Sequence, residues 1–266
     1  MVILITGATG GLGQVLGSLL ADKGETVYGT SRRPAERAGE VPFPLLPMDA
    51  HEQASVNTCF ETLMAREGRV DVVINCVNEM IIGSVEETDV EEASRLYDTN
   101  VFGIMRICKA AARVMKSQGG GTIVNMSSLG GLLAVPLMSS YTSAKFALEA
   151  FSEAFYHEMS LHNVDVVIMQ PVAMQMDRPE TGHHLRLATG VGPGSQSQKM
   201  LKQMAADTAA SNLTPQAVAE KIYQVIRQPR KPLRVPLDRA KGLEFLRRIL
   251  PQVAINRMVR GLVYGS

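Results

Sequence analysis

The sequence predicts an α/β fold with one doubly wound parallel sheet of about seven strands and helices on both faces. Short apolar runs alternate with longer stretches of helical periodicity along the chain. This alternation is typical of parallel sheets, because each crossover between parallel strands needs a covering helix. The runs expected to form strands are Val2–Ile5, Thr26–Thr30, Val41–Met48, Val70–Asn75, Thr122–Met126 and Val164–Gln170.

The third run differs from the others because it contains three prolines, Pro42, Pro44 and Pro47. Proline has no backbone N–H, so each one would remove a hydrogen bond from a central strand. A doubly wound sheet in the common order 3-2-1-4-5-6 places its third strand at the edge. We therefore expect this strand at an edge of the sheet.

Length, composition and charge favour one domain that acts on a small molecule. A chain of 266 residues with 45% hydrophobic residues can bury a full core. No repeat, low-complexity tract or linker divides it, so one domain is expected over residues 1–266. With 27 Lys and Arg against 26 Asp and Glu, the net charge of +1 offers no field that would gather nucleic acid.

Targeting and redox signals favour the cytoplasm. The chain runs from Met1 directly into an apolar strand pattern, which argues against a signal peptide. No apolar run approaches the roughly 18 residues of a membrane helix, so no integral membrane segment is expected. Cys59, Cys76 and Cys108 lie far apart and form no CxxC pair, which favours buried thiols in a reducing compartment.

A glycine-rich turn joins the first strand to the first helix. The turn is Thr6-Gly7-Ala8-Thr9-Gly10-Gly11-Leu12-Gly13, and an apolar helical pattern then runs to Lys23 with Gly24 as its stop. Glycines allow the backbone to approach a pyrophosphate, and a helix N-terminus offers free N–H groups to an anion. The alternative is a tight turn without a ligand, because one glycine loop alone is weak evidence.

Tyr141 and Lys145 form a YxxxK pair at the start of a long helix expected from Tyr141 to His162. A separation of four places both on one helix face, about 5–6 Å apart at Cβ. Tyrosine ionises near pH 10, and a neighbouring ammonium group would favour its phenolate. Ser128 precedes Tyr141 by thirteen residues and ends the fifth strand, where its hydroxyl can reach a bound carbonyl. A tyrosine and a lysine on a partly exposed helix face are the alternative.

The TGxxxGxG turn, the YxxxK pair and the serine thirteen residues earlier together resemble the short-chain dehydrogenase/reductase family. The resemblance covers nearly the whole chain and implies a Rossmann-like fold with hydride transfer between nicotinamide and a carbonyl or alcohol. Within the family, the pattern is similar to NADP(H)-dependent ketoreductases of the hydroxysteroid and retinol type. The implied catalytic tetrad is Asn100, Ser128, Tyr141 and Lys145.

The resemblance implies a role for each member of the tetrad. Tyr141 exchanges a proton with the substrate oxygen, and Ser128 orients the carbonyl. Lys145 bonds the nicotinamide ribose, while the backbone of Asn100 holds a water that links the lysine to solvent. A simple helix irregularity is the alternative at Asn100. Ser127 is expected to serve structure, and no metal takes part.

The end of the second strand favours NADP(H) over NAD(H) as the cofactor. An acidic residue there suits a free ribose hydroxyl, whereas arginine suits a 2′-phosphate. Here the strand ends in Ser31-Arg32-Arg33, and no acidic residue occurs before Glu36. A solvated basic turn is the alternative, above all for Arg33. The cofactor-binding residues implied are Gly7, Thr9, Gly11, Leu12, Gly13, Ser31, Arg32, Arg33, Asp49, Ala50, Asn75, Cys76, Tyr141, Lys145, Pro171, Val172 and Met174.

Two loops depart from the family pattern. The usual NNAG after the fourth strand reads Asn75-Cys76-Val77-Asn78, so Asn78 is expected to adopt whatever backbone conformation the family glycine uses. The usual PGxVxT after the sixth strand reads Pro171-Val172-Ala173-Met174-Gln175-Met176. We expect this loop to cover the nicotinamide through backbone contacts.

Two further segments are expected to cover the substrate. A lid is predicted over about residues 174–212, with a loop at Gly190–Ser195 before a short helix. A basic, amphipathic C-terminal extension follows over about 238–266, for which a subunit contact or pocket cover is favoured over a membrane surface. His183 and His184 lack the spacing of a metal site, so no metal is expected. The apolar lid side chains are Met174, Met176, Leu185, Leu187, Met200, Leu201 and Met204.

The function expected is reversible, NADP(H)-dependent hydride transfer to a lipophilic ketone or aldehyde. Methionine suits apolar pockets that must adapt, although ordinary packing of the lid would need the same residues. A catalytically silent dinucleotide-binding protein is the alternative, as is an unusual reaction such as double-bond reduction or isomerisation. A homodimer or homotetramer is expected through the helices that contain Asn100 and Tyr141.

Overall fold

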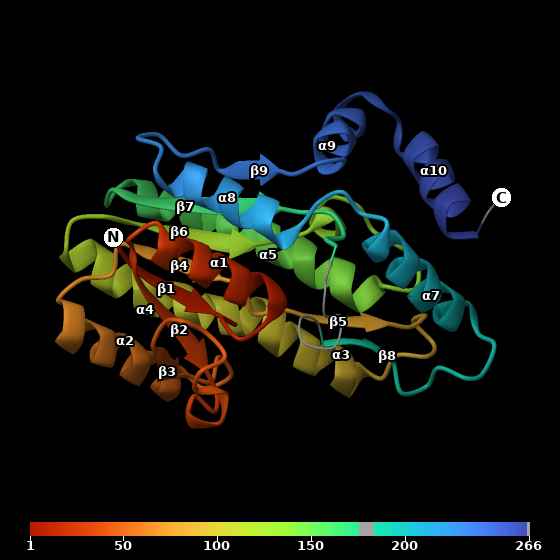
Figure 1. Cartoon of the computed structure of the whole chain (residues 1–266). Helices are drawn as coiled ribbons and strands as arrows, with labels where there is room; N and C mark the ends of the chain where they lie inside the picture. The colour runs from red at the N-terminus through yellow and green to blue at the C-terminus, as the bar shows by residue number, and fades with distance from the viewer. Residues whose placement is uncertain (176–183, 265–266) are drawn as a thin grey trace.

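The main sheet has seven parallel strands in the order β3-β2-β1-β4-β6-β7-β9 (Figure 1). The computed structural model describes residues 1–175 and 184–264. This topology confirms the doubly wound α/β fold with its predicted strand order. The strands are β1 Val2–Thr6, β2 Thr26–Ser31, β3 Leu45–Pro47, β4 Val72–Asn75, β6 Gly121–Met126, β7 Val164–Gln170 and β9 Arg234–Pro236.

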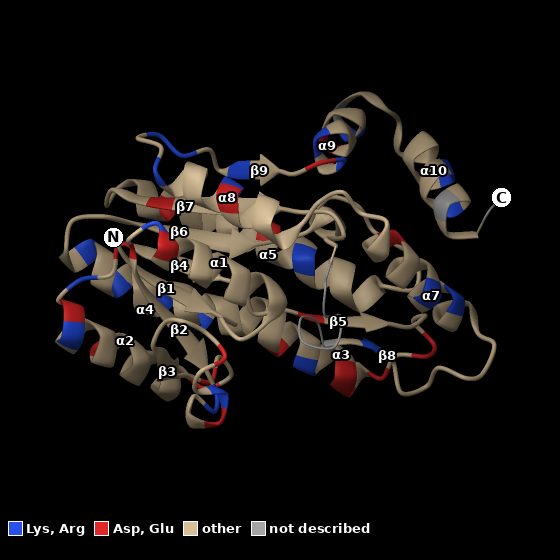
Figure 2. Ribbon diagram, viewed as in Figure 1, with Lys and Arg blue, Asp and Glu red and all other residues tan. Residues whose placement is uncertain are grey.

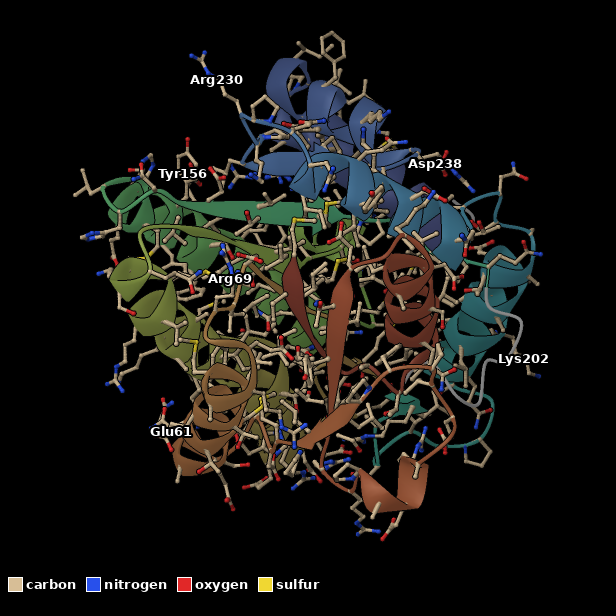
Figure 3. The ribbon with its side chains drawn as sticks, turned by 60° about the vertical axis from the view of Figure 1, so that its left-hand side comes forward. Glu61, Arg69, Tyr156, Lys202, Arg230 and Asp238 are labelled. Carbon is tan, nitrogen blue, oxygen red and sulfur yellow. The ribbon has the colours of Figure 1, made fainter. Side chains whose placement is uncertain are left out.

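Helices cover both faces of this sheet (Figures 1 and 3). Helices α1 and α8 pack together on one face, and α2, α4 and α5 lie on the other. Each face has its own apolar core, because every residue of a strand such as β1 is buried and successive side chains point to opposite sides. The helices are α1 Gly11–Asp22, α2 Gln53–Glu67, α4 Ile104–Ser117, α5 Ser139–Ser160 and α8 Pro215–Ile226.

The third strand lies at the edge, as its prolines predict. It is shorter than expected, because only Leu45–Pro47 pairs with β2. The preceding carbonyl of Pro44 still accepts a hydrogen bond from the Gly29 amide at 2.9 Å. Prolines thus keep the upstream part of the run out of regular pairing, since they lack the N–H donor of a ladder.

A second, two-stranded parallel sheet lies beside the carboxyl edge of the main sheet. It pairs β5 (Glu79–Ile82) with β8 (His184–Leu187), which comes from the predicted lid. Helix α3 (Val90–Tyr97) and helix α7 (Gln196–Ala209) pack near this pair. The sequence did not predict either strand. The predicted loop before a helix at the end of the lid is present.

The chain ends in α9 (Ala240–Ile249) and α10 (Gln252–Tyr264), two short helices that stand away from the main sheet at the upper right of Figure 1. Their buried side chains include Leu243, Ile255 and Val259, which pack against Leu132 and Leu133. Within residues 1–175 and 184–264, no helix has both the length and the apolar character needed to span a membrane.

Candidate active site

The candidate active site lies where β4, β6 and β7 end and α5 begins. Parallel strands present their carboxyl ends at one edge, where doubly wound sheets bind ligands. Tyr141 and Lys145 lie in the first turns of α5, and both are almost fully buried, at 4% and 1% exposure. The Lys145 ammonium lies 5.7 Å from the centroid of the Tyr141 ring. The structure therefore places the YxxxK pair on one buried helix face.

Lys145 is held by a backbone carbonyl at the end of β6. Its Nζ donates a hydrogen bond of 2.9 Å to the carbonyl oxygen of Met126. Burial lowers the pKa of Lys145 to about 7, while the charges of Glu149 and Cys76 act in the opposite direction. The side chain can therefore change its protonation state near neutral pH.

The burial of Tyr141 works against its ionisation. Burial raises the pKa of Tyr141 to about 12, and only a hydrogen bond with Ser128 lowers it. The sequence predicts that the Lys145 ammonium favours the phenolate, but Lys145 does not contribute to the pKa of Tyr141. A hydroxyl that keeps its proton is suited to donating that proton to a nascent alkoxide.

Two serines at the end of β6 have different surroundings. The Ser128 hydroxyl oxygen accepts a hydrogen bond of 3.1 Å from the amide of Gly130 and caps the turn Leu129–Gly131. Ser127 is buried, and its hydroxyl has no partner among the described residues. Ser128 therefore follows the end of β6, as the sequence predicts, and its hydroxyl contacts Tyr141.

Asn100 lies in a π-helical turn, Asp98–Gly103, between α3 and α4. Its side chain clamps one residue of β5, because Oδ1 accepts from the Glu79 amide at 2.8 Å and Nδ2 donates to the Glu79 carbonyl at 2.7 Å. The helix irregularity considered from the sequence is thus present. Such π-helical turns occur frequently at functional sites. Glu79 itself pairs with the first residue of the lid strand β8.

A buried chain of side-chain hydrogen bonds braces the strands behind the site. Thr6 donates to Asn75, Asn75 donates to Asn125, and Asn125 donates to Ser152 on α5, at 3.2, 2.8 and 2.9 Å. All four residues are fully buried. The brace holds β1, β4 and β6 in register with the helix that carries Tyr141. It also accounts for the side chain of Asn75, whose predicted contact with a dinucleotide stays a prediction.

The glycine turn fits the close approach of an anionic group. Gly7 has a left-handed φ of +66°, and a Cβ there would lie 2.9 Å from the Val77 amide nitrogen. A Cβ at Gly13 would lie 2.4 Å from the carbonyl oxygen of Gly7. The N-cap of α1 is Gly10, which offers no side-chain cap to the first amides of the helix. These features fit a dinucleotide pyrophosphate at the helix N-terminus.

Three arginines follow β2 beside this turn. Arg32 and Arg33 are exposed, and Arg33 forms an ion pair of 3.4 Å with Glu36. The sequence prediction missed Arg37, whose guanidinium donates a hydrogen bond of 3.3 Å to the carbonyl oxygen of Thr9. Arg37 thereby ties the segment after β2 to the glycine turn. Only proximity in space identifies it, because no motif separates it from other surface arginines.

Asp49 and Ala50 follow β3 at the same edge of the sheet. The Asp49 carboxylate accepts a hydrogen bond of 3.0 Å from the His51 amide. The carbonyl of Ala50 accepts one of 3.1 Å from Arg106 on α4. Both residues thus lie in an ordered turn at the carboxyl end of β3, where the resemblance implies a contact with the cofactor.

The altered loop after β4 does not use a left-handed backbone. Among the described residues other than glycine, positive φ angles occur only at Leu137, Asn163 and Asp238. Asn78 therefore has no left-handed backbone, and its agreement with the conformation of the family glycine stays a prediction. The chain instead continues directly into β5 at Glu79. The Asn78 side-chain oxygen is buried without a partner among the described residues.

The altered loop after β7 is described as far as Gln175, so Met176 lies outside the described residues. Pro171 accepts a hydrogen bond of 2.8 Å from the Leu129 amide, next to Ser128. Val172 packs against the residues that contact the C-terminal helices, whereas Met174 is buried among residues of α1 and α8. The backbone of the loop thus borders Ser128, and cover of a nicotinamide by this loop stays a prediction.

Apolar side chains of the lid gather around Tyr141. Leu185 and Leu187 of β8 and Met200 and Met204 of α7 belong to the cluster that contains Tyr141. Leu201 belongs to it as well, whereas Met176 and His183 lie outside the described residues. The side of the candidate site that faces β8 and α7 is therefore apolar.

A buried carboxylate anchors the lid. Glu92 of α3 is 2% exposed and accepts hydrogen bonds from Arg186 of β8 and from the amide and hydroxyl of Thr189. Burial raises the pKa of Glu92, but the hydrogen bonds from Thr189 and Arg186 outweigh this effect and leave the pKa below its usual value.

Within the described part of the chain, no cluster of His, Cys, Asp or Glu could hold a metal ion.

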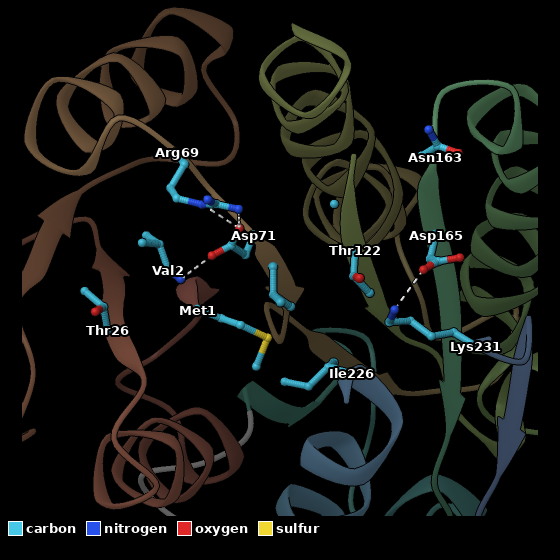
Figure 4. A pocket seen from close by; sticks show the side chains of 12 residues that line it. Met1, Val2, Thr26, Arg69, Asp71, Thr122, Asn163, Asp165, Ile226 and Lys231 are labelled. Carbon is cyan, nitrogen blue, oxygen red and sulfur yellow. Dashed lines mark hydrogen bonds and ion pairs between the residues drawn. The ribbon is translucent and has the colours of Figure 1, made fainter. Parts of the chain in front are cut away.

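A hollow of about 630 Å³ lies at the opposite, amino-terminal edge of the sheet (Figure 4). Its charged side chains pair with one another, as in the contacts Arg69–Asp71 and Lys231–Asp165, the latter at 2.8 Å. Asp71 also accepts a hydrogen bond from the amide of Val2 at 2.7 Å. These contacts join the ends of strands and leave no charged side chain directed at a ligand. The hollow is therefore not the candidate active site.

Comparison with known proteins agrees with this geometry. A family model described as short chain dehydrogenase matches residues 1–181. A 3-ketodihydrosphingosine reductase from Bacteroides thetaiotaomicron is 38% identical over 170 residues, which are 64% of this chain and 62% of that protein. Oxidoreductase calM from Penicillium decumbens is 31% identical over 252 residues, 88% of this chain and 82% of that protein. The chain thus spans less than two thirds of the Bacteroides relative.

Solved structures share the fold over almost the whole chain. A short-chain dehydrogenase from Streptomyces avermitilis is 27% identical with a TM-score of 0.82, and the match covers 98% of this chain and 97% of that one. A short-chain dehydrogenase from Burkholderia cenocepacia in complex with NADP has a TM-score of 0.76 at 20% identity, covering 96% of both chains. A short chain dehydrogenase/reductase from Burkholderia phymatum in complex with NAD also has a TM-score of 0.76 at 20% identity, and the match covers 93% of this chain and 92% of that one. At 20% identity, these two show the fold alone.

Proposed function

Because the chain belongs to the short-chain dehydrogenase family, we propose that it is an oxidoreductase that transfers a hydride between NADP(H) and a carbonyl or alcohol. One observation carries this proposal: Tyr141 and Lys145 are buried on one helix face, with Ser128 hydrogen-bonded to the tyrosine. Nicotinamide, when bound, supplies or accepts the hydride. The protein's own groups then have to orient the substrate oxygen and move one proton.

The proton step belongs to Tyr141. With a pKa near 12, its hydroxyl is protonated at neutral pH and can donate to an alkoxide as that charge develops. The Ser128 hydroxyl can donate a hydrogen bond to the same oxygen and so orient the carbonyl. Lys145, with a pKa near 7, can return a proton to the tyrosine after each turnover. Asn100 fixes the backbone of β5 beside these groups.

NADP(H) is the cofactor proposed, on the basis of charge at the end of β2. Arg32 and Arg33 are exposed there, and Arg37 is tied to the glycine turn. Guanidinium groups bind phosphate through two parallel hydrogen bonds, which a ribose hydroxyl cannot match. No carboxylate occurs between the end of β2 and Glu36, so none is available there for a ribose hydroxyl.

A lipophilic ketone is the substrate proposed. The lid presents leucine and methionine side chains to the cluster around Tyr141, and such side chains adapt to long apolar groups. The Bacteroides relative is named as a reductase of 3-ketodihydrosphingosine. That name makes long-chain ketones the first substrates to test.

The decisive experiment measures NADPH and NADH oxidation with a panel of short- and long-chain ketones and aldehydes. We expect turnover with NADPH, a preference for the longer chains, and loss of turnover in Tyr141→Phe. Tyr156→Phe, on the same helix, is the matched control and should retain activity. Arg32→Asp should weaken NADPH binding and favour NADH. Equal use of both dinucleotides by the parent protein would refute the cofactor proposal.

The two altered loops favour one second candidate, a dinucleotide-binding protein without reductase activity. Cys76 and Asn78 replace the family residues after β4, and Pro171 is followed by Val172 instead of glycine. NADPH binding measured by fluorescence separates the two candidates. Binding without oxidation of NADPH across the whole panel, and with no effect of Tyr141→Phe, would favour this second function.

A location in the cytoplasm is proposed as well.

Pairing of subunits through α4 and α5 is also proposed. Phe102 and Met105 are exposed, at 48% and 38%, beside a hollow of about 620 Å³ lined by α2, α4 and α5. Exposed apolar side chains that adjoin a hollow are typical of association surfaces. Sedimentation velocity should show a dimer or tetramer, which Phe102→Glu should dissociate.

A further inference from the structure

The C-terminal helix pair, α9 and α10, carries a basic and apolar outer surface. Residues 239–266 contain six Lys and Arg residues and one acidic residue. The preceding 238 residues contain 21 Lys and Arg residues and 25 acidic residues. Figure 2 shows basic residues, in blue, on both helices. Residues 239–266 therefore carry a net charge of +5, whereas the rest of the chain carries −4.

The exposed face of each helix combines apolar with basic side chains. Lys241, Phe245 and Ile249 follow one another at intervals of four on α9, so they share one helix face. Phe245 is 62% exposed and Ile249 is 58% exposed. Lys241 is also exposed and forms no ion pair among the described residues. Large apolar side chains thus lie in solvent next to an unpaired cation.

Helix α10 repeats this arrangement. Val253, Arg257, Arg260 and Tyr264 lie at spacings of four, three and four, which keeps them on one face. Val253 is 71% exposed and Tyr264 is 49% exposed. The two arginines are exposed and form no ion pair with any described residue.

The opposite faces of the two helices attach them to the substrate side of the protein. Leu243 and Ile255 are buried against Leu132 and Leu133, which follow the catalytic serine in the chain. Arg247 donates a hydrogen bond to the carbonyl of Leu132 and lies 5.6 Å from the Phe146 ring centroid. The exposed face is therefore presented by a docked pair of helices, whose side chains point outward at the top of Figure 3.

We propose that α9 and α10 dock the protein on an anionic lipid surface. Short amphipathic helices bind at the bilayer interface when apolar side chains insert and Lys or Arg contact anionic headgroups. A second copy is disfavoured, because a symmetric contact through this face would place like charges opposite one another. The apolar side chains also project from two separate helices, which a deformable lipid surface accommodates without a matching groove.

The test is co-sedimentation of the full chain with vesicles, without substrate, so its outcome does not depend on the proposed reaction. We expect binding to vesicles of phosphatidylcholine with about 30% phosphatidylglycerol, and little binding to phosphatidylcholine alone. Raising the salt from about 0.1 to about 0.5 M should weaken binding. Equal binding to both kinds of vesicle, or no binding at all, would overturn the proposal.

Paired variants separate the two contributions. Arg257→Gln with Arg260→Gln should lower the vesicle partition coefficient about 25-fold, at about fivefold per basic side chain. Phe245→Glu with Val253→Glu should abolish binding while leaving the thermal melt unchanged, because both side chains are exposed. The control for the arginine pair is Arg95→Gln with Arg230→Gln. The control for the apolar pair is Leu161→Glu, at a side chain that is 83% exposed at the end of α5.

Two further outcomes count against the proposal. If the control variants weaken binding as much as the matched variants, a general charge effect explains the result. If Phe245→Glu with Val253→Glu changes the sedimentation coefficient of the protein free of vesicles, the face is an interface between copies of this chain. Retained binding in both helix-pair variants would also overturn it.

Discussion

The end of α5 that carries Tyr141 and the segments that cover it are held in place by different interactions. Behind Tyr141, a chain of four buried polar side chains links three strands to the helix. The lid and the C-terminal helix pair instead rest on apolar clusters, with Glu92 as the main polar anchor of the lid. A hydrogen-bonded brace requires particular residues at particular positions, whereas apolar packing accepts many combinations of similar volume. Substitutions of similar volume should therefore be tolerated in the covering segments, whereas substitutions in the hydrogen-bonded brace should not.

The largest effect is expected from Lys145→Met, which tests whether the catalytic end depends on one particular side chain. Removing the ammonium that bonds the Met126 carbonyl should lower turnover by about 10²–10⁴-fold, the usual contribution of proton-transfer groups. Steady-state NADPH oxidation with the best ketone measures it. Lys202→Met, an exposed lysine on α7, is the control. Turnover within a factor of about three of the parent would contradict residue-specific catalysis.

Asn125→Ala tests the brace directly. The substitution removes the oxygen that accepts from the Asn75 amide and the amide that donates to the Ser152 hydroxyl, so the free energy of unfolding should fall by about 3 kcal/mol. Urea denaturation followed by circular dichroism measures it. Asn212→Ala, at an exposed asparagine, should change stability by less than about 0.5 kcal/mol. A loss at Asn125 no larger than at Asn212 would show that the brace does not support the site.

The same contrast explains what the sequence could predict. The strand order, the edge strand and the positions of Tyr141, Lys145 and Ser128 were predictable, because glycine turns, prolines and the YxxxK spacing each have one physical reason. The strands β5 and β8 were not, since a run such as Glu79–Ile82 is short and its partner lies about 100 residues away. Arg37 and Glu92 were missed for a similar reason: only the fold brings them to Thr9 and Arg186.

A smaller effect is expected from Glu92→Gln, which weakens the polar anchor of the lid. The neutral side chain keeps its shape but loses the ion pair with Arg186, which is 38% exposed, so the cost in stability should be about 1 kcal/mol. Hydrogen exchange should become faster in β8 while the amides of β1 stay protected. The KM for a long-chain ketone should rise more than kcat falls.

Glu91→Gln, at the exposed neighbouring residue, is the matched control for this variant. It should leave exchange in β8 unchanged. Faster exchange throughout the sheet in Glu92→Gln would indicate that the lid and the main sheet open together. In that case the two regions would not differ in the way proposed here.

The burial of Lys145 should also make the stability of the protein depend on pH. Burial lowers the pKa of this lysine from 10.5 to about 7, so between these values the unfolded chain binds a proton that the folded chain lacks. Stability should therefore rise with pH from 7 to 9, by about 1 kcal/mol per pH unit relative to Lys145→Met. Buried Cys59 and Cys108 are present in both proteins, so their titration cancels in the difference. A difference between the two proteins that stays constant over this range would show that Lys145 keeps its charge in the folded state, and proton return to Tyr141 would then need another donor.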